Sequence, residues 1–185
     1  TCNRGQTISL IGPNGSGKTT LIKCLLGMVV PDCGFITFNN KNILHDWKYR
    51  ANIGYMPQIG RFPDNMRIAQ VLDMMKDIRK GTNKEPDEEL IHQFELEKIM
   101  DKRMRTLSGG TRQKVGACLA FLFNPDVLIL DEPTAGLDPV SSEILKEKIR
   151  REKSKGKLIM VTSHILSDLE DITTEIVYLQ DGKLR

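Results

Sequence analysis

The sequence has no long hydrophobic run, no large excess of charge of either sign and few aromatic residues. Its longest apolar run, residues 117–123, is far shorter than the roughly 20 residues that a membrane-spanning helix needs. It has 27 Lys and Arg against 24 Asp and Glu, and a net charge of +3 lacks the basic excess typical of nucleic-acid-binding proteins. We therefore expect no membrane span in these residues and no polyanion as the main ligand.

Paired cysteines are also missing. The four cysteines have no C-x-x-C spacing, which favours reduced, small apolar residues over a disulfide or a zinc site. The 185 residues are 39% hydrophobic and 28% charged, which is ordinary for one globular domain and excludes a disordered chain. The chain begins at Thr1 without a signal-peptide pattern, and we expect a trimmed N-terminus.

What the sequence does contain is an alternation of short apolar runs and helical patterns. Strands are expected at residues 6–11, 34–38, 52–56, 126–131, 157–162 and 175–180, and helices at 18–26, 110–123, 139–153 and 165–171. This order predicts an α/β fold, a parallel sheet with crossover helices. Residues 64–105 instead read as helical, with a helix starting at Pro86, so we expect an α/β core of residues 1–58 and 106–185 with an inserted helical lobe, residues 59–105.

A glycine-rich loop follows the first expected strand. Residues 12–19, GPNGSGKT, fit G-x-x-x-x-G-K-[ST] between a strand and a helix. Inward-facing amides and the helix N-terminus would surround a phosphate. Lys18 should reach the β and γ phosphates, Thr19 should offer its hydroxyl to Mg²⁺, and Thr20 should cap the helix or contact the α phosphate. The nucleotide-binding residues are expected to be Gly12, Pro13, Asn14, Gly15, Ser16, Gly17, Lys18, Thr19 and Thr20.

Two acids end a fully apolar strand, VLILDE. Asp131 lies where open α/β sheets place ligand chemistry, so its carboxylate is expected to hold Mg²⁺. Glu132 is expected to act as the general base for water that attacks the γ phosphate. A strand-end cap or a surface ion pair is the plain alternative for both. Together with the glycine-rich loop, the acids indicate a P-loop NTPase.

A second helix N-terminus follows at LSGGTRQ, residues 107–113, where Ser108 is the expected N-cap. Alone, this segment would be only a capped helix start. Its free amides, together with those of the glycine-rich loop, provide two anion-binding helix N-termini in one small domain, which indicates a shared ligand.

In this order, the motifs resemble the ATP-binding-cassette (ABC) transporter nucleotide-binding subunit over essentially the whole chain. GPNGSGKTT corresponds to Walker A, LSGGTRQ to the signature, VLILDEP to Walker B and Gly136-Leu137-Asp138 to the D-loop. The resemblance implies a RecA-like core, ATP and Mg²⁺ as ligands, and two further catalytic residues, Gln58 and His164. Gln58 would also contact the metal. Read alone, these two would be an ordinary loop residue and a capping or core histidine.

The resemblance also implies partners. Two copies would pair head to tail, so that Ser108 and Gly110 of one copy complete the ATP site of the other, with Asp138 communicating between the two sites. The helical lobe would contact a separate transmembrane permease at the cytoplasmic face of the membrane, without nucleic acid. Five methionines suit an adaptable contact surface, although Met74 and Met75 could equally be core: Met66, Met74, Met75, Met100 and Met104.

One part of the family pattern is missing. The family carries an aromatic residue that stacks on adenine before Walker A, yet residues 1–11 contain no aromatic residue. Two antiparallel strands that normally precede residue 5 are also absent.

The TAGLDP stretch and the compact lobe resemble cassettes of ABC-2-type exporters. Within these, IGYMPQIGRFPDNM resembles the copper-processing type of nitrous-oxide reductase maturation. The alternatives are a soluble ABC ATPase acting on nucleic acid or ribosomes, and an inactive cassette that binds ATP without hydrolysis.

Overall fold

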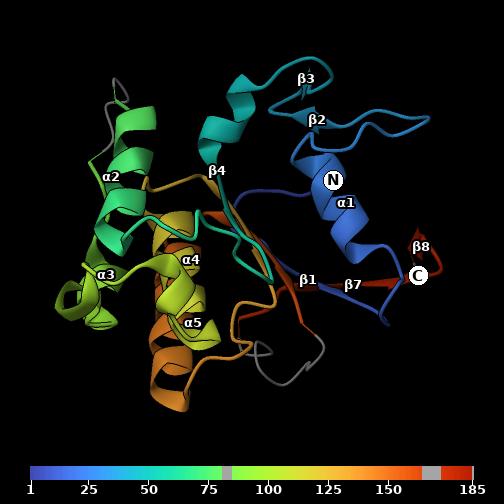
Figure 1. Ribbon diagram of the computed structural model, residues 1–185. Helices are drawn as coiled ribbons and strands as arrows, with labels where there is room; N and C mark the ends of the chain where they lie inside the picture. Colours follow the sequence, from blue (N-terminus) through green and yellow to red (C-terminus); the bar gives the residue numbers. More distant parts are fainter. Residues whose placement is uncertain (81–84, 164–171, 185) are drawn as a thin grey trace.

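A six-stranded sheet forms the centre of the molecule in the computed structural model, which describes residues 1–80, 85–163 and 172–184 (Figure 1). Its strands lie in the order β4-β5-β6-β1-β7-β8. Five run parallel, and β8 pairs antiparallel with β7 at the edge. Their bounds are β1 Thr7–Ile11, β4 Ile53–Met56, β5 Val127–Asp131, β6 Leu158–Thr162, β7 Glu175–Gln180 and β8 Lys183–Leu184.

Helices cover both faces of this sheet because alternate strand residues point to opposite sides. On one face, α1 (Lys18–Leu25) packs Ile22 against Ile129 of β5. On the other face, Leu128 and Leu130 belong to the larger core with α4 (Gly109–Phe121) and α5 (Pro139–Ser154). The predicted parallel sheet with crossover helices is confirmed.

The segment between β4 and α4 is helical. It contains α2 (Ile68–Ile78), α3 (Glu89–Gln93) and the 3₁₀ turns η2 (Leu96–Ile99) and η3 (Met104–Thr106), and α2 and α3 lie beside α4 (Figure 1). Ile68, Val71 and Leu72 are the buried residues of α2, and their spacing places them on one face of the helix. In the part of the chain described, no helix is both long and apolar enough to cross a membrane.

The predicted start of a helix at Pro86 is wrong, because α3 begins at Glu89. The backbone N–H of Asp87 donates to the carbonyl of Leu122 at 2.6 Å, and the Asp87 carboxylate accepts from the Glu89 N–H at 3.1 Å. These bonds hold Asp87 against the end of α4, so that α3 begins only at Glu89. The helix expected at residues 165–171 lies outside the described residues.

The strand predicted at residues 34–38 is shorter than expected. Only β2 (Thr37–Phe38) pairs, with β3 (Lys41–Asn42), around Asn39 and Asn40 at φ 49° and 62°. Two consecutive left-handed residues make the tight turn that joins such a hairpin. Gly34, at φ 83°, is in a turn conformation rather than a strand. A short 3₁₀ helix, η1 (Lys48–Asn52), then leads into β4.

Residues 146–157 carry the densest run of charges, whose composition alone would predict a solvated helix face, yet two of the charged side chains are buried. Lys148 of α5 is 1% exposed and bonds to Asp87 at 2.5 Å and to Glu89 at 2.8 Å. Glu152, equally buried, lies 3.5 Å from Lys148. Burial opposes the charge of Lys148, but these carboxylates raise its pKa overall. The ions therefore link α5 to the segment before α3.

The five methionines also differ from the prediction. Met104 is buried in the main core, so its place on a contact surface is wrong. The other four, Met66, Met74, Met75 and Met100, are half-buried, and all of them except Met74 pack against that core.

Candidate nucleotide site

The carboxyl ends of four parallel strands meet at one edge of the sheet. The glycine-rich loop follows β1, Gln58 follows β4, and Asp131 ends β5. Thr162 ends β6 directly opposite Asp131 in the strand register. Open α/β sheets bind ligands at this edge, outside the carboxyl ends of the strands.

The glycine-rich loop between β1 and α1 is held in shape by its glycines. Gly12, Gly15 and Gly17 have φ values of 152°, 78° and 104°, conformations that other residues rarely adopt. A Cβ on Gly12 would lie only 2.0 Å from the Leu179 carbonyl oxygen, so the loop needs glycine there. The Gly182 N–H donates to the Ser16 carbonyl at 3.0 Å, which packs the turn after β7 against the loop.

The Lys18 ammonium is already directed into this loop. Its Nζ donates to the carbonyl oxygens of Gly12 at 2.7 Å and Pro13 at 3.0 Å, and the side chain is buried. A buried ammonium bonded only to neutral carbonyls is well placed to pair with an anion, because charge-assisted bonds are the stronger ones.

The acidic pair is held by Thr162. The Thr162 hydroxyl donates to the Asp131 carboxylate at 2.5 Å and accepts the Glu132 N–H at 3.0 Å. Glu132 has φ 52°, a left-handed backbone that costs a non-glycine residue roughly 1–3 kcal/mol. On its other side, the Gln113 side chain donates to the Glu132 carbonyl at 3.2 Å.

The sequence motifs do not single out Thr162, although its position at a strand end opposite Asp131 is a signal that could have found it. Gln113 is the last residue of the LSGGTRQ signature, and the sequence alone predicts no separate role for it.

These elements enclose one cavity of about 190 Å³ at the sheet edge. It brings together nine of the residues that the sequence predicts: Asn14, Gly15, Gly17, Lys18, Thr19, Thr20, Gln58, Asp131 and Glu132. Gly12, Pro13 and Ser16 do not line the cavity but shape its loop. Three oxygen donors, Thr19, Gln58 and Asp131, share it, and Mg²⁺ prefers an oxygen-only set of this kind.

The signature and D-loop residues stay outside that cavity. Ser108 is exposed and caps α4, accepting the Thr111 N–H at 3.2 Å. Gly110 packs tightly on the D-loop, where an added Cβ would lie 2.6 Å from the Gly136 carbonyl oxygen. Asp138 caps α5 and pairs with Lys114 at 3.0 Å. Its bonds from Ser141, helped by Lys114, lower the pKa of Asp138. His164 lies outside the described residues.

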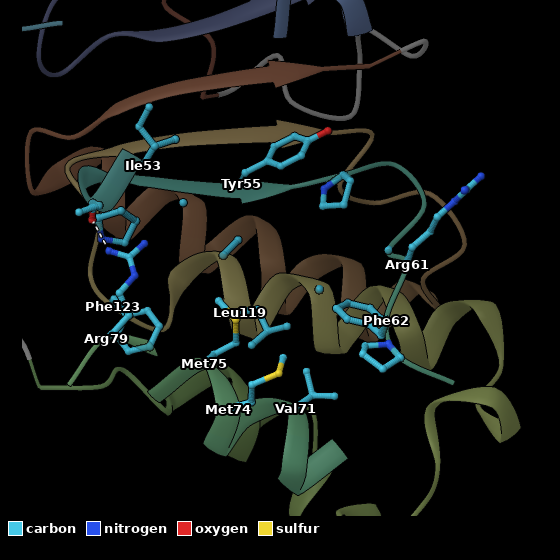
Figure 2. A pocket seen from close by; sticks show the side chains of 18 residues that line it. Ile53, Tyr55, Arg61, Phe62, Val71, Met74, Met75, Arg79, Leu119 and Phe123 are labelled. Atoms are coloured by element: carbon cyan, nitrogen blue, oxygen red, sulfur yellow. Dashed lines mark hydrogen bonds between the residues drawn. The ribbon is translucent and has the colours of Figure 1, made fainter. Parts of the chain in front are cut away.

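A second, apolar hollow opens beside the nucleotide cavity, between β4, α2 and α4 (Figure 2). Its volume is about 390 Å³, and we call it the lobe groove. The side chains labelled in Figure 2 that line it are Ile53, Tyr55, Arg61, Phe62, Val71, Met74, Met75, Arg79, Leu119 and Phe123. Pro57 also lines the groove while the next residue, Gln58, lines the nucleotide cavity, so consecutive residues of the chain line the two hollows.

One end of the lobe groove is closed by Arg79. Its guanidinium donates to the Ala51 carbonyl at 2.8 Å and lies 5.3 Å from the centre of the Phe123 ring (Figure 2). Burial, and to a smaller extent the charge of Asp131, raises the pKa of Tyr55 in the groove wall. The charge of Asp131 in the nucleotide cavity therefore acts on Tyr55 in the wall of the groove.

Known proteins are similar to this chain in sequence and in fold. The profile described as ABC transporter matches residues 1–135. Nod factor export ATP-binding protein I of Ralstonia nicotianae is 32% identical across 97% of this chain and 57% of its own length. The lipopolysaccharide export system ATP-binding protein LptB of Haemophilus influenzae is 32% identical across 100% of this chain and 79% of its own. A solved ATP-binding subunit of an ABC transporter superposes with a TM-score of 0.90 at 30% identity, covering 100% of this chain and 78% of that chain.

The chain spans little more than half the length of several of its curated relatives, among them the Nod factor export protein. The matches nevertheless cover both the Walker A loop and the signature helix. The predicted P-loop NTPase fold and the predicted family are both confirmed. The chain belongs to the ABC transporter family and carries that family's ATP-binding domain.

Proposed function

We propose that this protein is the ATP-hydrolysing subunit of an ABC transporter. The observation that carries the proposal is the single cavity in which Lys18, Gln58, Asp131 and Glu132 meet beside the glycine-rich loop. A binding module without turnover would need the loop and the lysine. It would not need a carboxylate held on a strained backbone at the cavity edge.

In the proposed reaction, the loop amides and Lys18 bind the β and γ phosphates of ATP. Glu132 accepts a proton from water as the water oxygen bonds to the γ phosphorus, and the bond to the ADP oxygen breaks. ADP and inorganic phosphate result, and the proton returns to solvent from Glu132. His164 would add a further contact to the γ phosphate.

Thr19, Gln58 and Asp131 would hold Mg²⁺. When bound, Mg²⁺ supplies positive charge to the β and γ phosphate oxygens. The Thr162 bond to Asp131 orients that carboxylate in advance.

The signature residues support a head-to-tail pair of chains. Ser108, Gly110 and Asp138 do not line the cavity of their own chain, and Ser108 and Asp138 are exposed. A partner's α4 N-terminus would direct its amides at the γ phosphate, supplying positive partial charge that the described part of the cavity obtains only from Lys18 and the loop. The cavity would therefore close only when two chains and ATP assemble.

The lobe groove supports a membrane partner. We propose that residues 59–105 form a lobe around the inserted helices and that the groove receives a short apolar helix of a separate permease at the cytoplasmic face of the membrane. The groove is apolar and about twice the volume of the nucleotide cavity, and the consecutive residues Pro57 and Gln58 line the groove and the cavity respectively. A helix seated there would sense closure around ATP through these two residues.

The relatives support an export system. The names of two relatives refer to export, of Nod factor and of lipopolysaccharide. The resemblance to the copper-processing type stays a prediction, because the cargo would be held by the permease.

The experiment that tests the proposal compares ATP turnover of the full-length protein, purified from membranes, with and without its co-purifying membrane subunits. We expect a membrane protein to co-purify and to change the rate of phosphate release. Added RNA or DNA should leave that rate unchanged. Stimulation by nucleic acid, with no membrane protein bound, would favour the soluble ABC ATPase instead. Binding of ATP without turnover would favour the inactive cassette.

A further inference from the structure

Helix α4, which begins with the signature, has one buried polar side chain that contacts the backbone of Glu132 in the same chain. Gln113 of α4 is 6% exposed, and its Nε2 donates to the Glu132 carbonyl oxygen at 3.2 Å. It does not line the nucleotide cavity. Gln113 therefore reaches the site only through the backbone of Glu132.

The contact falls on a residue whose backbone needs support. Glu132 has a left-handed backbone, with φ 52°. Its N–H donates to the carbonyl and the hydroxyl of Thr162, at 3.2 and 3.0 Å. A strained conformation persists where neighbouring contacts fix it from several sides. Thr162 holds the nitrogen side of Glu132, and Gln113 holds the carbonyl side.

The helix that carries Gln113 also carries the signature. Ser108 caps α4, and Gln113 lies five residues later, about 7.5 Å along a rigid helix. The next residue, Lys114, pairs with Asp138 at 3.0 Å. A shift of the α4 N-terminus would therefore displace Gln113 and Lys114 together.

We propose that Gln113 is a positioning residue that fixes the Glu132 carboxylate and links it to the signature helix of the same chain. The inference rests on the proposed function, in which the α4 N-terminus binds the ATP held by the partner. Docking of α4 on the partner's ATP would then set the general base of its own site. Each site would become competent when the other is filled.

A purely structural Gln113 would act differently. It would support the α4 N-terminus, so its loss would weaken ATP-driven pairing of the chains and raise the KM for ATP. A positioning residue instead changes kcat and leaves ATP binding and pairing intact.

The test measures kcat and KM for ATP in Gln113→Met, which keeps the side-chain length and removes the donor. We expect kcat to fall about tenfold, the loss of one buried hydrogen bond, with KM changed by less than twofold. Gln93→Met is the matched control, because Gln93 is exposed on α3 and bonds only to the nearby Glu89 in its described contacts. Gln113→Glu is a second variant of the same shape that faces the carbonyl with carboxylate oxygens. It should lose at least as much kcat.

The second readout is ATP-driven pairing in the Glu132→Gln background. Adding Gln113→Met there should change the ATP concentration for half-maximal pairing by less than twofold. Unchanged kcat in both Gln113 variants, or pairing weakened as much as kcat falls, would overturn the inference. Failure of the proposed function looks different, because Glu132→Gln itself would then keep wild-type turnover.

Discussion

The nucleotide cavity and the lobe groove lie side by side but are built in opposite ways. The cavity is small, polar and rich in backbone amides, and the groove is about twice as large and mostly apolar. The cavity draws on short motifs whose residues are contiguous in sequence. The groove draws on single residues of β4, α2 and α4 that meet only in the fold.

This difference matches the two proposed functions, ATP hydrolysis in the cavity and partner binding in the groove. Hydrolysis needs fixed charges and donors at defined atoms, which contiguous loop residues provide. A groove for a partner helix needs apolar area of the right shape, which many side chains can supply. Substitutions in the cavity should therefore change chemistry without changing partner binding, and substitutions in the groove should do the reverse.

The largest effect is expected for Glu132→Gln. If Glu132 is the general base, as proposed, its removal should lower ATP turnover roughly 1,000-fold, since such a base contributes about 10²–10⁴-fold. ATP affinity and membrane-subunit binding should stay within about threefold of wild type. Steady-state phosphate release measures the first, with Glu143→Gln on the exposed face of α5 as the control. Wild-type turnover would refute the general-base role.

Lys18→Ala should weaken ATP binding about 100-fold, because it removes the ammonium that, in the proposed site, would make charge-assisted bonds to two phosphates. Fluorescent nucleotide titration measures the affinity. Lys23→Ala, an exposed lysine later on α1, is the matched control. An unchanged affinity in Lys18→Ala would contradict the phosphate contact and with it the cavity assignment.

Leu119→Asp tests whether the lobe groove binds the membrane subunits. A carboxylate in the apolar lobe groove should weaken binding of the membrane subunits roughly tenfold through its desolvation cost, with ATP affinity within twofold of wild type. Ile78→Asp is the control, since Ile78 is exposed on α2 outside the groove lining. Retained subunit binding by Leu119→Asp, measured by co-purification, would rule out the groove as the docking site.

Arg79→Met should have the smallest effect. It removes the bond to Ala51 and the contact with Phe123, and should lower the free energy of unfolding by about 1 kcal/mol. Lys80→Met, an exposed neighbour, should leave it nearly unchanged, as surface substitutions usually do. Chemical denaturation measures both. Equal effects would mean that the Arg79 contacts with Ala51 and Phe123 do not stabilise the fold.

The sequence predicts the cavity better than it predicts the groove for a physical reason. The glycine-rich loop and the Asp131-Glu132 pair carry their chemistry in adjacent residues, so spacing alone locates them. Met104 has the residue type of an adaptable contact surface, yet it is buried in the main core, because burial depends on how the elements pack and not on residue type alone. Lys148 and Asp87 form an ion pair across 61 positions that no local pattern reports. Thr162 meets Asp131 through strand register, which also depends on the fold.

In the proposed head-to-tail pair, Ser108 of one chain completes the nucleotide cavity of the other. The most direct measurement is the molar mass of Glu132→Gln by light scattering, with and without ATP. ATP should double the mass of this variant, while Ser108→Arg in the same background should stay at the monomer mass and still bind ATP normally. Equal pairing of the two variants, or loss of ATP binding by the single chain carrying Ser108→Arg, would contradict the claim.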